Sequence, residues 1–164
     1  MIVLKNILVA TDFGEQSEAA LTYGRDLART FSARLHVLHV VENIAVRFAN
    51  EALGAFLPEL QTQLDESARK RIEALVTDED RATLHATSAV ITSVGAAETI
   101  VRYAKDHATD LIVVGTHGRR ALDRLLMGSV AERVVRTAPC PVLTVRHPER
   151  EFVVPDALVA AARA

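Results

Sequence analysis

The sequence has little of what would place a chain outside the cell or in a membrane. Its 164 residues include one cysteine, so no internal disulfide can form and nothing favours an oxidising compartment. No apolar run approaches the roughly 18 residues that a membrane-spanning helix needs. The first ten residues lack the basic start, long apolar centre and small-residue cleavage site of a signal peptide. We therefore predict a cytoplasmic protein with no membrane partner.

An excess of charge of one sign is also absent. The formal net charge is −2 at pH 7, with 24% of the residues charged. A general attraction to nucleic acid or to an anionic membrane would need a strong positive excess. We therefore predict no nucleic-acid partner.

Aromatic residues are few, and several enzyme motifs are missing. There is no tryptophan and only 4% of the residues are aromatic, whereas 49% are hydrophobic, so we expect one domain with a core of Val, Leu, Ile and Ala. The sequence contains no Gly-x4-Gly-Lys-Ser/Thr, no Gly-x-Gly-x-x-Gly and no Gly-x-Ser-x-Gly. These absences argue against a P-loop hydrolase, a dinucleotide-binding fold and an α/β-hydrolase.

Apolar patterns predict strands and helices that alternate along the chain. Short apolar runs predict strands at 5–10, 35–41, 84–94, 111–114 and 141–145. Apolar residues at helical spacing predict helices at 17–30, 57–76, 96–108 and 129–137. Residues 42–54 have no clear period, and 77–80 form a polar break. This alternation is typical of an α/β fold with a parallel sheet and helices on both faces.

Two helices have apolar stripes that we expect to face the core. In the last helix, Val130, Val134 and Val135 should point partly inward. In the 57–76 helix the stripe runs through Leu57, Leu60, Leu64, Ala68, Ile72 and Leu75.

Some single residues also receive an interpretation. His36 and His39 lie three apart on a strand, so they point to opposite faces and cannot share a metal. Gly24 lies inside a helix, where it is expected to allow close packing on the sheet. Cys140 stands between two prolines and is interpreted as a packing residue rather than a nucleophile.

A glycine-bearing segment follows the fourth predicted strand. Gly115 and Gly118 come directly after the strand, and a charged span then leads to Gly128 and Ser129 at the start of the next predicted helix. Glycines let the backbone approach an anion closely and take positive φ, and a helix start presents unpaired N–H groups. The segment is therefore predicted to bind phosphate groups.

The spacing Gly-x2-Gly-x9-Gly-Ser resembles the signature of the ATP-binding branch of the universal stress protein family. The resemblance also covers 5–14, the strand end at 39–41 and the close at 138–145, so it spans about residues 1–146. It implies a single doubly wound sheet of five parallel strands in the order 3-2-1-4-5, with helices on both faces. In such a sheet a ligand binds outside the carboxyl ends of the strands, where the winding direction reverses.

The resemblance also implies where a nucleotide would lie. The adenine would lie against Val40 and the Asp12 loop, the ribose near Ala10 and Gly115, and the phosphates at the glycine segment and the helix start. Asp12 would reach a phosphate-bound Mg²⁺ through water, or would equally fix its loop or cap the next helix. The full expected set of binding residues is Ala10, Thr11, Asp12, Val40, Val114, Gly115, Thr116, His117, Gly118, Arg119, Gly128, Ser129 and Val130.

Two of these residues carry alternatives. Arg119, with Arg120, either neutralises a triphosphate or forms a solvated basic face. His117 is a candidate acid or base, but we interpret it as positioning a phosphate. No catalytic residue and no protein metal ligand is assigned.

The predicted function is that of an ATP-binding stress-response regulator that acts through a change of conformation or of partner binding. ATP, with or without Mg²⁺, is the expected ligand, and the protein partner is unknown. Two alternatives stay open: a slow ATP hydrolase or adenylate-transferring enzyme, and a protein that works through protein contacts alone.

The family resemblance implies a homodimer through the last strand, 141–145, whose apolar edge would be exposed. Residues 1–146 form the predicted nucleotide-binding domain. Residues 147–164 are an extension that either packs on the partner subunit or forms a frayed tail.

Overall fold

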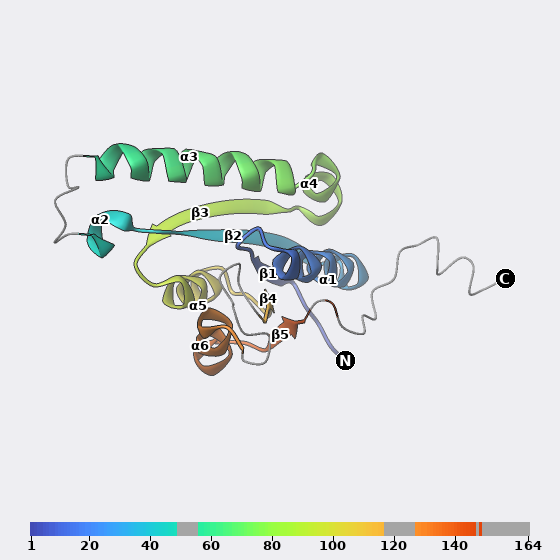
Figure 1. Ribbon diagram of the computed structural model, residues 1–164. Helices are drawn as coiled ribbons and strands as arrows, with labels where there is room; N and C mark the ends of the chain where they lie inside the picture. Colours follow the sequence, from blue (N-terminus) through green and yellow to red (C-terminus); the bar gives the residue numbers. More distant parts are fainter. Residues whose placement is uncertain (49–55, 117–126, 147, 149–164) are drawn as a thin grey trace.

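Five parallel strands form one sheet in the computed structural model, which describes residues 1–48, 56–116, 127–146 and 148 (Figure 1). The sheet order is β3-β2-β1-β4-β5, and each described pairing is parallel. The predicted order 3-2-1-4-5 is therefore confirmed. The strands are β1 (Asn6–Ala10), β2 (Arg34–Glu42), β3 (Thr87–Ser93), β4 (Leu111–Gly115) and β5 (Val142–Val145).

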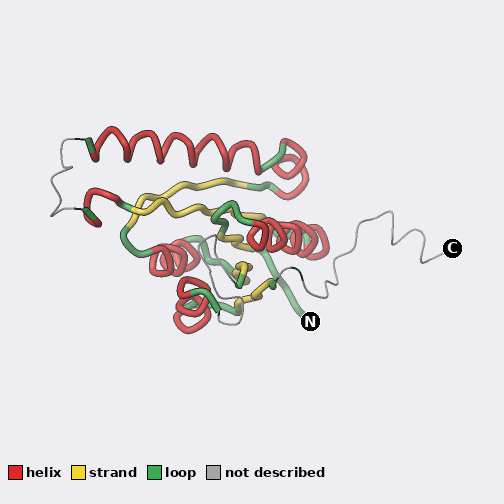
Figure 2. The backbone as a smooth tube through the Cα atoms, in the orientation of Figure 1, coloured by secondary structure: helices red, strands yellow, loops and turns green. Residues whose placement is uncertain are grey.

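Helices cover both faces of this sheet, as predicted (Figures 1 and 2). Helices α1, α3 and α4 pack on one face, and α5 and α6 pack on the other. A short helix, α2, follows β2 within the stretch where the sequence shows no clear period. The helices are α1 (Glu15–Phe31), α2 (Ile44–Arg47), α3 (Leu57–Leu75), α4 (Asp78–Leu84), α5 (Ala96–Asp106) and α6 (Ser129–Thr137).

The centre of the core is β1. Ile7 and Val9 pack beneath α1, whereas Leu8 points to the opposite face and packs beneath α5 and α6. All three side chains are fully buried. A central parallel strand covered on both faces is apolar throughout, which explains why this segment lacks polar alternation.

Helix α1 lies unusually close to β1. A methyl group added at Gly24 would overlap Cγ2 of Val9, which is itself fully buried. The predicted role of Gly24 in close packing on the sheet is confirmed.

The prediction of a strand at 84–94 was wrong at its start. Residues 78–84 form α4, and β3 begins only at Thr87. The Thr77 hydroxyl accepts a hydrogen bond from the Asp80 N–H, while the Asp80 carboxylate accepts one from the Thr77 N–H. Such a reciprocal capping box starts a helix, so the supposed polar break is a helix start.

Helices at the two sheet edges bury less than their stripes predicted. On α3, Leu60 and Leu64 are 47% and 40% exposed, although Ala68 and Ile72 are buried. On α6 only Val134 of the three predicted valines is buried, whereas Val130 and Val135 are exposed. The reason is that α3 packs over edge strand β3 and α6 over edge strand β5, where the sheet beneath is narrow.

The two histidines of β2 point to opposite faces, as predicted. His39 donates from Nδ1 to the Thr11 carbonyl, 2.7 Å away. His36 is buried on the other face, with Nδ1 3.1 Å from the Thr87 hydroxyl, and its Nε2 has no hydrogen-bond partner among the described residues. Burial, and then the charges of His107 and Arg34, lower the pKa of His36 to about 4.

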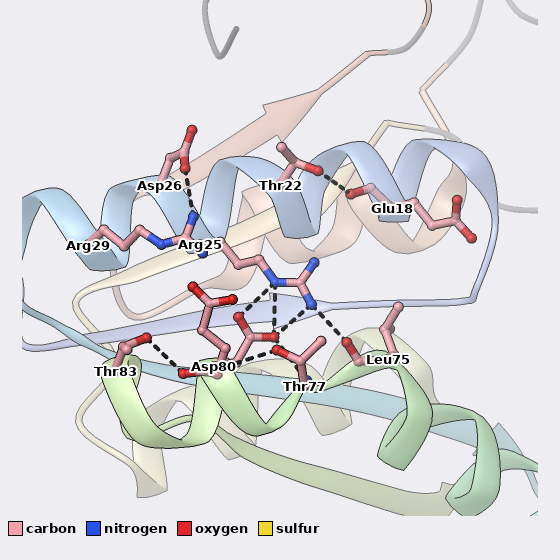
Figure 3. Close-up of polar contacts among 10 residues, drawn as sticks. Glu18, Thr22, Arg25, Asp26, Arg29, Leu75, Thr77, Asp80 and Thr83 are labelled. Carbon is pink, nitrogen blue, oxygen red and sulfur yellow. Dashed lines mark hydrogen bonds and ion pairs between the residues drawn. The ribbon is translucent and has the colours of Figure 1, made fainter. Parts of the chain in front are cut away.

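A buried ion pair joins α1 to α4 (Figure 3). Arg25 of α1 donates to both carboxylate oxygens of Asp80, at 2.7–3.1 Å, and to the Leu75 carbonyl at the end of α3, at 2.7 Å. The Asp80 side chain is only 3% exposed. Burial alone would raise the pKa of Asp80, but the hydrogen bonds from Arg25 and Thr77 outweigh it, so the pKa lies below its ordinary value.

Replacing Arg25 with methionine should lower the free energy of unfolding by about 3 kcal/mol, because it leaves the Asp80 carboxylate buried without its partner. Arg29→Met is the matched control: it lies on the same helix and breaks an exposed pair with Asp26, for which less than about 1 kcal/mol is expected. Urea denaturation of both variants at pH 7 measures the difference. Equal losses of unfolding free energy in the two variants would show that the buried pair contributes no more to stability than the exposed one.

Stability should fall as the pH drops from about 6.5 to 4, because the unfolded chain takes up a proton at His36 in that window while the folded chain does not. The full effect is about 3 kcal/mol, at 1.36 kcal/mol for each unit of difference between the unfolded and folded pKa values. Urea denaturation at several pH values measures it. In His36→Gln the free energy of unfolding should fall less between pH 6.5 and 4, because the contribution of His36 is gone. A fall equal to that of the wild type would contradict the low pKa of His36.

Candidate functional site

The candidate site lies at the carboxyl end of the sheet, where β1 has β2 on one side and β4 on the other. The chain reverses its winding direction here, which is the position where open α/β sheets bind ligands. Ala10 at the end of β1 is in register with Val114 of β4 and with Leu38 of β2. The carboxyl ends of β1 and β4, which carry most of the expected site residues, therefore lie side by side at the same end of the sheet.

The loop after β1 is held by its own polar groups. The Thr11 N–H donates to the Leu38 carbonyl at 2.9 Å, and the Thr11 hydroxyl accepts from the Phe13 N–H at 3.0 Å. The Asp12 carboxylate accepts from the N–H of Gly14, the N-cap of α1, at 3.0 Å. Of the three roles weighed for Asp12, the structure shows the one that fixes the loop, whereas the N-cap of α1 is Gly14 and not Asp12. The magnesium role stays a prediction.

Phe13 sits at the turn of this loop with φ 61°, in the left-handed region that a side chain rarely adopts. Its ring lies 4.3 Å from the His39 ring, and the guanidinium carbon of Arg71 lies 4.1 Å from its centroid. These two contacts hold the strained residue in place, so the loop has a defined shape.

The end of β4 packs tightly on the start of α1. A methyl group added at Gly115 would stand 3.0 Å from the backbone carbonyl carbon of Gln16. The Thr116 hydroxyl donates to the Gln16 side-chain oxygen at 2.9 Å. Gly115 thus packs closely on the start of α1. The expectation of positive φ is wrong for the glycines that the structure describes, including Gly128 at φ −62°.

The start of α6 is tied to the end of β4. The Gly128 N–H donates to the Thr116 carbonyl at 2.7 Å, and the Gly128 carbonyl accepts from the Glu132 N–H. Gly128 is the N-cap of α6, and no side-chain cap bond forms there. The first turn therefore presents backbone N–H groups at Ser129 and Val130, with the positive end of the helix dipole behind them.

Ten of the thirteen expected site residues lie in the described part of the chain. Three of them, Thr11, Val114 and Thr116, are buried, so their side chains support the crevice rather than line it. His117, Gly118 and Arg119 lie outside the described residues. The described set is Ala10, Thr11, Asp12, Val40, Val114, Gly115, Thr116, Gly128, Ser129 and Val130.

A hollow of about 560 Å³ adjoins this site between the starts of α5 and α6. It shares Ser129 and Val130 with the expected set, and Glu98, Arg102 and Arg133 also line it. These three charged residues were missed in the sequence analysis, because each is an ordinary polar position of an amphipathic helix and no motif marks it.

The described residues form neither a metal-binding cluster nor a membrane-spanning helix. No group of three or more His, Cys, Asp or Glu side chains could hold a metal ion there. Similarly, none of the helices seen in these segments is long and apolar enough to cross a bilayer.

The strand order, with its winding reversal between β1 and β4, defines a doubly wound α/β protein. The chain belongs to the universal stress protein family, whose model matches residues 4–146. A universal stress protein of Methanocaldococcus jannaschii is 34% identical over 148 residues, covering 90% of this chain and 85% of that protein. A universal stress protein A homologue of Coxiella burnetii is 33% identical, covering 86% of this chain and 95% of that protein.

Solved structures agree with this assignment. A universal stress protein from Lactobacillus plantarum is 30% identical with a TM-score of 0.72, covering 89% of this chain and all of that chain. Two more distant structures, each 20% identical, share the fold: a universal stress protein in complex with cAMP, TM-score 0.57, and one from Archaeoglobus fulgidus in complex with dAMP, TM-score 0.52. They cover 88% of this chain, and 98% and 99% of their own chains.

Replacing Gly115 with alanine should lower the free energy of unfolding by about 1 to 3 kcal/mol, because the new methyl group presses on the backbone of Gln16. Gly95→Ala is the matched control: its methyl group would meet chiefly the end of the Glu98 side chain, which can move aside, so only the cost of alanine at a helix N-cap is expected, less than about 1 kcal/mol. Urea denaturation compares the two variants, and similar losses would contradict the packing role of Gly115.

Proposed function

We propose that this chain binds ATP, with or without Mg²⁺, in the crevice at the ends of β1, β2 and β4. The occupied protein acts as a nucleotide-responsive stress-response regulator, through a change in conformation or in its affinity for a protein partner. The proposal draws on family membership, on the glycine spacing and on relatives of the same fold that were solved with cAMP and dAMP.

The observation that carries the proposal is the bond from the Gly128 N–H to the Thr116 carbonyl. It fixes the start of α6 directly beside the end of β4, and β4 is bonded to β1. Backbone donors of the first helical turn therefore lie at the same end of the sheet as the loop that starts at Thr11. In the proposed complex, the base lies against Val40 and the Asp12 loop, and the phosphates lie at Ser129 and Val130.

The energetics of such a complex are adequate without a phosphate-reaching lysine. Each hydrogen bond to a charged phosphate oxygen contributes about 1.5 to 3 kcal/mol. Micromolar affinity requires only about −8 kcal/mol in total. A few backbone N–H groups, together with burial of the base, reach this value after the ordering costs of binding.

Regulation is preferred over catalysis because the titratable side chains seen at the crevice already serve the loop. Asp12 accepts from the Gly14 N–H, and His39 donates to the Thr11 carbonyl. His117, the other candidate acid or base, lies outside the described residues. Slow ATP hydrolysis or adenylate transfer at the same site is the competing function, and ADP or AMP formed in step with protein concentration would favour it.

The proposal extends to assembly and location. Strand β5 is the last strand on its side of the sheet, and we propose that it forms the contact of a homodimer. Residues 1–146 would form the nucleotide-binding domain, and the extension 147–164 lies outside the described residues apart from Pro148. A cytoplasmic location fits a chain with a single cysteine.

Calorimetric titration of nucleotide-stripped protein with ATP and Mg²⁺ tests the proposal. The wild type should bind saturably, and Gly128→Val should weaken binding at least tenfold, about 1.4 kcal/mol, because a branched side chain then stands at the start of α6. Arg136→Gln, an exposed change in the last turn of the same helix, is the control and should bind as the wild type does.

Each outcome has a distinct meaning. A wild type that binds no adenine nucleotide up to millimolar concentration would overturn the proposal and leave a function through protein contacts alone. Binding that Gly128→Val does not weaken would place the nucleotide elsewhere on the molecule.

A further inference from the structure

The hollow between α5 and α6 extends the proposed nucleotide site along the second turn of α6. Ser129, Val130 and Arg133 all line it, and they belong to consecutive turns of one helix. Arg133 follows Ser129 by four residues, so both side chains lie on the same side of α6. Side chains of a helix lean toward its N-terminus, which directs Arg133 back toward Ser129.

Arg133 is held by a carboxylate across the hollow. Its Nε lies 2.7 Å from the Glu98 carboxylate of α5. Both side chains are more than half exposed, so this ion pair stabilises the structure only weakly. A stronger anion placed in the hollow therefore competes effectively for Arg133.

The charge of the hollow favours such an anion. Its lining includes two arginines, Arg102 and Arg133, and one acid, Glu98, which gives a net charge of +1. The starts of α5 and α6 both open onto it, and each contributes the positive end of a helix dipole.

We propose that Arg133 is a specificity-determining residue that binds the outer phosphates of the nucleotide and so selects a triphosphate over a monophosphate. Without ligand, Arg133 pairs with Glu98. A triphosphate anchored at Ser129 and Val130 reaches into the hollow and takes Arg133 from Glu98, whereas a monophosphate is too short to do so. This inference rests on the proposed nucleotide site.

The exchange also gives the bound state a structural signal. In the free protein the Glu98–Arg133 pair ties the second turn of α6 to the start of α5. A bound triphosphate removes that tie and replaces it with a contact to the ligand. Triphosphate-bound protein then lacks this contact between α5 and α6, whereas monophosphate-bound protein keeps it.

Calorimetric titrations with ATP and with AMP measure the selectivity. Arg133→Gln should weaken ATP binding about tenfold, as expected for the loss of one charged hydrogen bond, and should change AMP binding less than about twofold. Arg136→Gln is the matched control, because it makes the same change three residues later on α6 in another exposed ion pair. It should leave both affinities unchanged.

A second variant tests the competition with Glu98. Glu98→Gln releases Arg133 and removes a carboxylate from the hollow, so ATP should bind about twofold to fivefold more tightly while AMP binding stays the same. A purely structural role for the pair would not give tighter ATP binding.

The outcomes separate this inference from the proposed function. Equal losses of ATP and AMP affinity in Arg133→Gln, or no loss of either, would overturn the role of Arg133 even if the wild type binds nucleotide. A Glu98→Gln variant that binds ATP more weakly would overturn the competition. A wild type that binds neither nucleotide would overturn the proposed function itself.

Discussion

Strand β1 is hydrogen-bonded on both sides, to β2 and to β4, and the rest of the molecule depends on this double pairing. It divides the chain into two halves that wind in opposite directions from the same central strand. Its three fully buried side chains supply both cores, because successive residues of a strand point to opposite faces. The loop after Ala10 consequently emerges between the two halves, at the only end where the helix starts of α1, α5 and α6 also gather among the described elements.

The alternation of strands and helices was predictable because buried parallel strands are apolar throughout and the helices between them carry a clear period. The errors arose where local polar chemistry or tertiary geometry decided the outcome. The capping box of Thr77 and Asp80 is legible in the sequence, yet an acidic stretch looks like a loop unless that pairing is recognised. The exposure of Leu60 and Leu64 could not be predicted from the sequence, because a stripe of leucines carries no information about how far the sheet extends beneath the helix.

The candidate site divides in a similar way. Glycine spacing and strand ends identified which segments meet at the crevice, but the reason for Gly115 is a contact with Gln16, far away in the sequence. Glu98 and Arg133 are further examples, since they meet only because α5 and α6 pack side by side. Pairings of this kind depend on tertiary structure and leave no mark on either segment alone.

The close packing of α1 on β1 at Gly24 limits how far the helix can move relative to the sheet. Helix α1 has no room to rotate or slide over the sheet, and it is also fastened to α4 by Arg25 and to the end of β4 by Gln16. The helices α1 and α4 and the sheet beneath them therefore form a rigid unit. On the opposite face of the sheet, α5 and α6 are joined near their N-terminal ends by the exposed Glu98–Arg133 pair, which is the contact that the proposed triphosphate would break. Under the proposed function, a protein partner that responds to the nucleotide would therefore contact the α5 and α6 layer rather than the α1 layer.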